Sequence, residues 1–593
     1  MRPLTLFVPA LLGALLAGGG AAQPAPPRTT FCDNDRALIA CQDTLRALLV
    51  VVRFAGDTSS GPEWPDSTAD GRPIPPRQLP PFARDLLAPT PEAVARTTPQ
   101  DSSLSAYFYW QSKHGPRGPH VLFGDVWPRN ARGEPEVFLS PHPASYYHRD
   151  QPERRGYGHL TADVLDSLVT VPGFDIGDYD YNRDGVVDHV FMVVKRDPAF
   201  RQQGWASLAG HEVAAARPQR TLRYWSPARR DSVRVDWSHS GSQSHLGNWA
   251  NREMLIHEYG HRLFGMPRHT PVIGPRDNDV PFDVPLTDRG TPVAACSFNR
   301  MCGGPALYDG ASHTLSAYEL RRMGWAARTV LDPADGDRPG VAIRPLYTRG
   351  EVVLIPLRPG APGDTLSVES RQRNNFFDNY PPYDGSSFDA GTVWRELGTT
   401  GLLVTLTRGD PMGGVSQYRY DYLPPDNELR RESRCEGPGN NCYPRDIYEG
   451  DMLRPGVATQ LTPWTRPSVS GYTHYPEGFE PNWFALTNVR YNGGPDSTMA
   501  FDLVADAREG LTITSDSWMG AETSGQTLPG RFVVAEGATL TVAAGAEVTF
   551  GGGLRVEEGA RLVVEEGAAV RFGPGRRLEL LGVLEGGGFV EGR

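Results

Sequence analysis

Residues 255–269 read LIHEYGHRLFGMPRH. His257 and His261 are four positions apart, and Glu258 directly follows the first histidine. Residues at i and i+4 share one face of a helix, so the two imidazoles can hold one metal ion. Good helix formers precede the motif, and Gly265 is a typical helix end. This stretch therefore predicts a zinc-binding catalytic helix, and a chance arrangement on an ordinary helix is the alternative.

The residue types around the expected zinc ion define a hydrolytic chemistry. Zinc lowers the pKa of a bound water towards about 7, which provides a nucleophile at neutral pH. Glu258 is expected to take the proton of that water and to return it to the leaving amine. The motif therefore predicts a zinc-dependent endopeptidase that hydrolyses peptide bonds of extracellular proteins.

The third zinc ligand is expected in the loop that follows the helix. After Glu258 the next glutamate is Glu319, which lies too far along the chain for a ligand on an adjacent second helix. A helix that stops at a glycine and then offers a loop ligand fits better. His269 is the nearest such group, and a solvated loop histidine is its alternative role. Weaker candidates are Asp277, Asp279, Asp283 and Asp309.

The N-terminus indicates export. Residues 1–22 contain one arginine, an apolar run and small residues, the pattern of a secretory signal peptide. A membrane anchor is the alternative, but Pro9 and several glycines interrupt a short run. No later stretch reaches the roughly 20 apolar residues that span a bilayer. We expect a secreted, extracellular protein in which residues 23–44 form an N-terminal segment before the first domain.

The cysteines agree with an oxidising compartment, because they fall in three close couples. Pairing within each couple is the simplest disulfide pattern, although six cysteines allow 15 connectivities. A cysteine-bound zinc is the alternative, but the chain has no C-x2-C couple. The six residues are Cys32, Cys41, Cys296, Cys302, Cys435 and Cys442.

The composition limits the class of partner. The net charge of −11 at pH 7 is spread without long runs of one sign, which argues against nucleic acid. We expect protein or peptide substrates, no membrane span and a monomer.

The first domain is expected to be mixed α/β and to span residues 45–330. Residues 45–56 and 188–196 carry the continuous apolar runs of buried strands, and residues 157–171 have helical spacing. A proline-rich stretch up to about residue 92 is expected to be a surface loop. The order of strands and helices favours a layered α/β domain.

The remaining chain is expected to be rich in β-structure. Short apolar alternations between Gly, Pro and Asn predict a β-sandwich-like domain over residues 331–507. Residues 508–593 contain a repeat in which Leu540 corresponds to Leu562 and Phe550 to Phe572, each 22 residues apart. This period predicts a β-solenoid, with a plain β-meander as the alternative. Surface or polymer contact, anchoring and capping are the open roles of these repeats.

A second metal site is expected in DYDYNRDGVVDHV. Asp180, Asn182, Asp184 and Asp188 hold positions 1, 3, 5 and 9 of a calcium loop, with Gly185 at the sharp turn. Position 12 is a phenylalanine where an EF-hand has glutamate. A structural calcium ion is the expected ligand, and a solvated Asx-turn loop is the alternative.

Taken together, these motifs resemble the immune inhibitor A-like family of secreted zinc metallopeptidases, which has a metzincin-like architecture. Similar stretches are LLVVVRFAGD, YFYWQSKHGPRGPHVLFGDV, DYDYNRDGVVDHVFMVV, LSAYELRRMGW and VESRQRNNFFD. The resemblance covers roughly residues 45–505 and leaves out the repeats.

The resemblance also implies a methionine turn below the zinc. In NRMCGG the corresponding residue is Met301, for which a plain core methionine is the alternative role. Cys296 and Cys302 flank this turn and are suited to brace it. Family members read H-x-x-G-L-P-D after the helix, whereas this chain has Arg268 where the acid is expected. The resemblance thus supports a loop ligand, and the chemistry of imidazole favours His269.

Two functions from different classes remain open at this stage. The first is the zinc endopeptidase, in which the edge of HVLFGDV would bind an extended substrate backbone. The second is a catalytically inactive peptidase fold that binds or adheres through its β-domains. The intact Glu258 favours the enzyme, while the altered sequence FGMPRH favours the binding protein.

Overall fold

The structure is a computed structural model. It describes residues 43–57, 64–147, 156–195, 207–208, 222–235, 241–246, 255–256, 258–260, 263, 315–357, 365–372, 400–408, 419–422, 452–466, 468–469, 482–493 and 498–591.

The first strand, β1 (Thr44–Arg53), lies in the middle of the N-terminal sheet. Successive side chains of a strand point to opposite faces, so Leu49 and Val51 join one core and Val50 and Val52 the other. Both faces are covered, which explains why the sequence here is apolar without alternation.

The sheet has the order β2-β1-β4-β8-β5, and β3 also pairs with β1. The pairs β1–β2, β1–β4 and β4–β8 are parallel, whereas β5 runs antiparallel to β8. The strands other than β1 are β2 (Val121–Trp127), β3 (Phe138–Leu139), β4 (His189–Lys195), β5 (Ser207–Leu208) and β8 (Gly241–Leu246).

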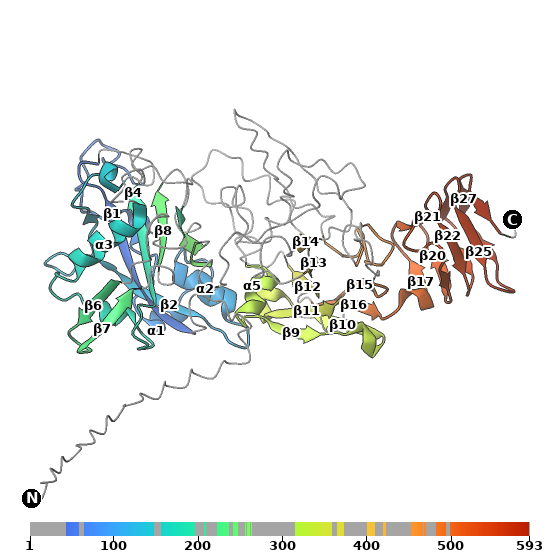
Figure 1. Ribbon diagram of the computed structural model, residues 1–593, viewed down its shortest axis with the longest axis horizontal. Coiled ribbons are helices and arrows are strands. Elements are labelled where there is room, and N and C mark those ends of the chain that lie inside the picture. The colour runs from blue at the N-terminus through green and yellow to red at the C-terminus, as the bar shows by residue number, and fades with distance from the viewer. Residues whose placement is uncertain are drawn as a thin grey trace, which may run out of the picture.

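Helices cover the two faces of this sheet (Figure 1). On one face lies α3 (Gly156–Leu168), whose apolar side chains pack with alternate residues of β1 and β4. On the other face lie α2 (Leu104–Ser112), helical residues between 255 and 263, and α5 (Ala317–Arg322). Ser103 caps α2 by accepting a hydrogen bond from the amide of Ala106.

The proline-rich stretch is largely exposed, as expected of a surface loop, but a few of its apolar side chains reach the core. Trp64, Leu79, Ala83, Leu86 and Leu87 are buried in the same core as α2. The stretch also includes the short helix α1 (Pro91–Ala95).

Two sheets form the middle of the molecule, in the orders β14-β13-β12-β11-β9 and β10-β16-β15. Their apolar side chains meet in one core, including Val368 and Val404 from the first sheet and Phe501 from the second. The elements are β9 (Ala327–Val330), β10 (Arg338–Ile343), α6 (Leu346–Arg349), β11 (Glu351–Pro356), β12 (Thr365–Arg371), β13 (Gly401–Arg408), β14 (Arg419–Tyr422), β15 (Ala485–Gly493) and β16 (Thr498–Val504).

The C-terminal strands stack in three parallel four-stranded sheets, β17-β20-β23-β26, β18-β21-β24-β27 and β19-β22-β25-β28. The repeat partners Leu540 and Leu562 are in register, as are Phe550 and Phe572. The strands are β17 (Gly510–Ile513), β18 (Ser517–Met519), β19 (Thr527–Leu528), β20 (Arg531–Val534), β21 (Thr539–Val542), β22 (Glu547–Phe550), β23 (Leu554–Val556), β24 (Arg561–Val564), β25 (Ala569–Phe572), β26 (Leu578–Leu580), β27 (Val583–Glu585) and β28 (Phe589–Val590).

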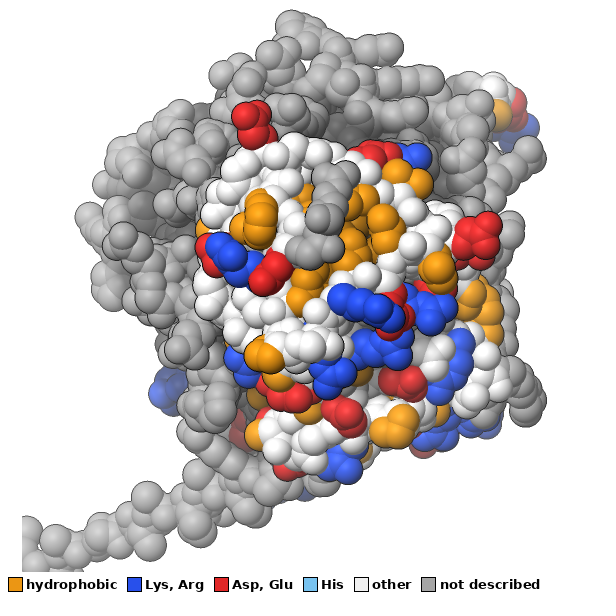
Figure 2. Space-filling model, turned by 90° about the vertical axis from the view of Figure 1, so that its right-hand side faces the viewer, with side chains coloured by type: hydrophobic (Ala, Val, Ile, Leu, Met, Phe, Trp, Pro, Cys, Tyr) orange, Lys and Arg blue, Asp and Glu red, His pale blue; other side chains and the backbone are white. Residues whose placement is uncertain are grey.

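The last repeat, which contains β26, β27 and β28, carries exposed apolar side chains. Figure 2 shows hydrophobic side chains gathered among Arg and acidic residues on the face that lies at the right of Figure 1. The exposed large hydrophobic residues of this repeat are Leu580, Leu581, Val583 and Phe589.

In the part of the chain that the structure describes, we find no helix of the length and apolar character that crossing a membrane requires.

Candidate functional site

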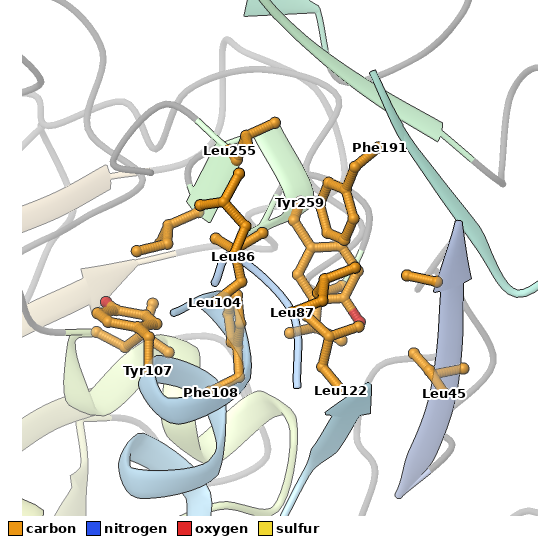
Figure 3. Packing of buried hydrophobic residues seen from close by; sticks show 14 of the residues in the cluster. Leu45, Leu86, Leu87, Leu104, Tyr107, Phe108, Leu122, Phe191, Leu255 and Tyr259 are labelled. Atoms are coloured by element: carbon orange, nitrogen blue, oxygen red, sulfur yellow. The ribbon is translucent and has the colours of Figure 1, made fainter. Parts of the chain in front are cut away.

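The site is built on the helical residues between 255 and 263, which pack against the sheet. Leu255, Ile256, Tyr259 and Leu263 are all fully buried in the core that also contains α2 and α5. Figure 3 shows the Tyr259 ring next to Phe191 of β4; the two ring centroids are 5.5 Å apart. The helix is thus fixed along one apolar face.

Glu258 lies within this helix, and its side chain is only 6 % exposed. A carboxylate is rarely buried unless it is paired or has a chemical role. The expected zinc ligands His257, His261 and His269 lie outside the described residues, as does Met301 of the expected methionine turn. The same holds for the six cysteines and their pairing.

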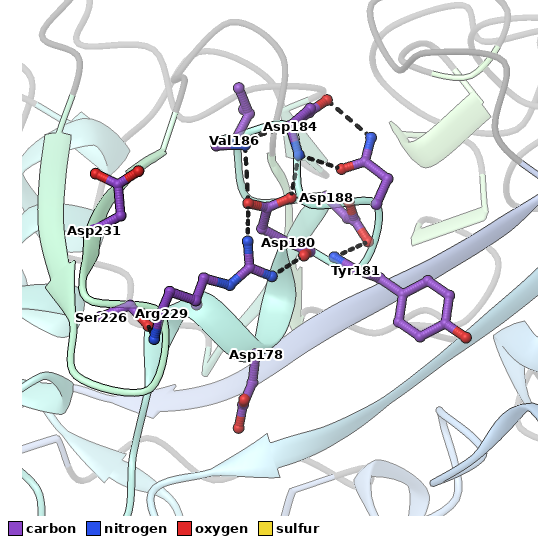
Figure 4. A network of polar contacts seen from close by, with 12 residues as sticks. Asp178, Asp180, Tyr181, Asp184, Val186, Asp188, Ser226, Arg229 and Asp231 are labelled. Atoms are coloured by element: carbon purple, nitrogen blue, oxygen red, sulfur yellow. Dashed lines mark hydrogen bonds and ion pairs between the residues drawn. The ribbon is translucent and has the colours of Figure 1, made fainter.

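The expected calcium loop is fully described, and its side chains bind the loop's own backbone (Figure 4). Asp180 accepts hydrogen bonds from the amides of Asp184 at 3.0 Å and Gly185 at 2.9 Å. Asp184 accepts one from the amide of Val186 at 2.8 Å, and the side-chain oxygen of Asn182 accepts one from the amide of Asp184 at 3.0 Å. These are Asx-type turns.

Asp188 is the last residue of the loop and directly precedes β4. Its carboxylate accepts hydrogen bonds from the amides of Arg46 at 2.9 Å and Tyr181 at 3.2 Å. Burial raises the pKa of Asp188 to about 7, although these two amides act in the opposite direction. The charges of Asp180 and Asp184 add to the rise.

Arg229 is a partner of the loop that sequence reasoning missed. It lies between β6 (Leu222–Ser226) and β7 (Asp231–Val235), and its guanidinium pairs with the Asp180 carboxylate and donates to the Asp180 carbonyl. Asp175 holds the hairpin in place by accepting hydrogen bonds from the Ser226 hydroxyl and the Ala228 amide. Because these residues are some 50 positions apart in sequence, no local spacing signals the contact.

The described loop therefore has the form of an Asx-turn loop neutralised by an arginine. Among the described residues, no three His, Cys, Asp or Glu side chains converge on a point where a metal could sit. A calcium ion does not fit this arrangement as it stands, because Arg229 occupies the Asp180 carboxylate. Calcium at this loop stays a prediction.

The strand that was expected to bind substrate is partly covered. HVLFGDV forms most of β2, which is the end strand of the sheet and pairs with β1. Its other side is bridged by Ala88, whose carbonyl accepts a hydrogen bond from the Gly124 amide at 2.9 Å. The Gly124 amide, in the middle of this edge, is therefore already bonded and not available to a peptide.

Comparisons of the chain with models of protein families, with curated proteins and with solved structures give no match.

Proposed function

We propose that the protein is a secreted zinc endopeptidase whose catalytic helix contains His257, Glu258 and His261. The observation that carries the proposal is the buried apolar face of this helix, formed by Leu255, Ile256, Tyr259 and Leu263, beside the buried carboxylate of Glu258.

Helix geometry connects this face to the histidine positions. At 3.6 residues per turn, positions 255, 256 and 263 lie within roughly 60° of Tyr259 around a regular helix. On such a regular helix, positions 257 and 261 are expected roughly 160° from position 259, on the face opposite the apolar one. We therefore expect both imidazoles on one face, which is the arrangement that a shared zinc ion needs.

Each residue then has a defined role. Zinc, when bound, supplies a Lewis acid that polarises the scissile carbonyl and activates water. His257, His261 and His269 would hold the ion. Glu258 takes a proton from the attacking water and delivers it to the leaving amine, and its low exposure keeps bulk water from competing for that proton.

Zinc content and peptide cleavage test the proposal together. We expect about one zinc per chain, as in other structural and catalytic sites of this ligand type, and cleavage of casein that a chelator abolishes. Glu258→Ala should keep the zinc and lose cleavage. A wild-type chain that lacks zinc, or a mutant as active as the wild type, contradicts the proposal.

The third ligand needs its own pair of variants. His269→Ala should lower the zinc content, whereas His211→Ala should leave it unchanged. His211 is a suitable control because it also precedes a glutamate, but no second histidine follows at the HExxH spacing. Full zinc content in His269→Ala would assign the third position to another group, such as one of the downstream aspartates.

A further inference from the structure

A buried polar pair lies directly behind the catalytic helix. The Tyr259 hydroxyl and Nε2 of His120 share a hydrogen bond of 3.0 Å, and both side chains are fully buried. Aromatic rings surround the pair: the Tyr259 ring lies 4.9 Å from Phe108 and 4.8 Å from the buried His189 ring, and the His120 ring lies 5.1 Å from Trp325. A phenylalanine at 259 would fill the same space without a hydroxyl to satisfy.

His120 is itself firmly held, so the bond anchors the helix to a rigid point. The His120 amide donates to the Ser112 hydroxyl at 2.7 Å, and that hydroxyl donates to the Phe108 carbonyl at 2.6 Å. His120 is therefore tied to the last turn of α2 and directly precedes β2. Tyr259 is the residue next to Glu258, so its position sets the rotation and depth of the catalytic helix.

We propose that Tyr259 and His120 are positioning residues, whose hydrogen bond holds Glu258 and the zinc ligands in register with the substrate. This inference rests on the proposed function. Apolar packing fixes which face of the helix is buried, and the directional hydrogen bond adds a constraint on its rotation and depth. A shift of about 1 Å at the reacting groups can reduce a rate by about a hundredfold, so a small loss of register has a measurable effect.

Tyr259→Phe tests the inference, with Tyr147→Phe as the matched control. Tyr147 is also fully buried, and its hydroxyl donates to Asp163 at 2.7 Å in the core on the other face of the sheet. Tyr259→Phe loses the hydrogen bond to His120, whereas Tyr147→Phe loses those to Asp163 and Ser140, so the control should be destabilised at least as much. Only Tyr259→Phe should lower kcat per zinc-loaded chain, by about tenfold with little change in KM. It should also shift the visible bands of the cobalt-substituted protein.

Variants at His120 keep the test decisive if Tyr259→Phe folds poorly. His120→Leu should reproduce the loss of kcat, and His120→Gln, which retains a hydrogen-bonding group, should restore most of it. Equal kcat and identical cobalt bands in Tyr259→Phe, His120→Leu and Tyr147→Phe would overturn the inference while leaving the zinc peptidase intact. A wild-type chain without zinc and without cleavage would instead overturn the proposed function, and this inference with it.

Discussion

At the scale of single residues, Arg229 is the most informative neighbour of the Asp-rich loop. Its guanidinium pairs with the carboxylate of Asp180, which holds the first ligand position of the expected calcium loop. A fixed cation at Asp180 competes with a metal ion for the same negative charge. Wild-type protein should therefore bind calcium only weakly, and removal of the arginine should strengthen binding.

We predict that calcium raises the Tm of the wild type slightly and that of Arg229→Gln clearly more. A ligand that binds only the folded state stabilises it by RT ln(1 + [L]/Kd), so at one calcium concentration a larger rise in Tm reports a higher affinity. Asp180→Asn should abolish the response in both backgrounds. Differential scanning fluorimetry with calcium, with magnesium as the control ion, measures this. An equal Tm with and without calcium in all variants would contradict the calcium prediction. The loop would then be an Asx turn that Arg229 stabilises.

Asp502 gives a prediction about pH. Its carboxylate accepts hydrogen bonds from the Gly340 amide, the Asn488 amide group and Arg490 at 2.7–3.0 Å. Partial burial would raise its pKa, but these donors outweigh it, so the pKa of Asp502 lies below its usual range. The folded state then binds fewer protons than the unfolded state, and stability is lost as the pH falls through the folded pKa.

Asp502→Asn should accordingly cost stability at pH 7, by about 1–3 kcal/mol as for hydrogen bonds to charged groups. The difference from wild type should shrink below about pH 4, where the unfolded carboxylate also takes up its proton. Calorimetric unfolding between pH 3 and pH 7 checks this. A difference that grows towards low pH would contradict the assigned contacts.

At the scale of elements, the turns between the stacked C-terminal strands depend on glycine. Gly545, between β21 and β22, has φ of +76°, and a Cβ added there would have no atom within 4 Å. Any cost of substitution is therefore conformational. Gly545→Ala should cost about 1–2 kcal/mol, whereas Gly545→Asn should cost less because asparagine tolerates this region. Calorimetry compares the two, and an alanine variant as stable as wild type would contradict this reasoning.

Much of the element pattern could be predicted from sequence, because local signals carried it. The apolar run at 45–56 predicted a buried strand, and β1 occupies it. The 22-residue period predicted the pairing of Leu540 with Leu562. The proline-rich stretch is mostly at the surface, as predicted, but composition does not show that Leu86 and Leu87 join the core beside α2.

For the candidate site, the sequence gives a prediction only where the residues are close together along the chain. The spacing of His257, Glu258 and His261 is a local signal for a catalytic helix. The long-range partners are not local: in the helix, Tyr259 is 139 residues from His120, and in the Asp-rich loop, Asp180 is 49 residues from Arg229. Contacts of this kind depend on the strand order of the sheet, which no single stretch encodes.

At the scale of the whole molecule, the middle β-domain completes the core of the N-terminal domain. Leu346, Tyr347, Val352 and Leu354 belong to the core that also contains Leu255, Ile256, Tyr259 and Leu263. The Tyr347 hydroxyl donates to the Leu315 carbonyl at 2.8 Å, just before α5. The two regions are therefore expected to fold together.

A chain that ends at residue 330 should accordingly fail to fold, whereas one that ends at residue 507 should keep a cooperative transition and its zinc. Each of the four buried apolar side chains contributes about 1.5–3 kcal/mol to the free energy of unfolding. Their sum is comparable to the whole stability of a domain. Circular dichroism and calorimetry compare the two chains. A folded, zinc-loaded 1–330 chain would show that the β-domain is an independent module.

The central claim is that Glu258 is the general base of a zinc endopeptidase. The most direct measurement is kcat on one peptide for wild type, Glu258→Gln and Glu212→Gln, each at equal zinc content. Glu212 is the matched control because it also follows a histidine. We predict that Glu258→Gln lowers kcat by at least about 10²–10⁴-fold, the usual share of a general base, while Glu212→Gln stays at the wild-type value. Equal kcat in the two variants would contradict the account.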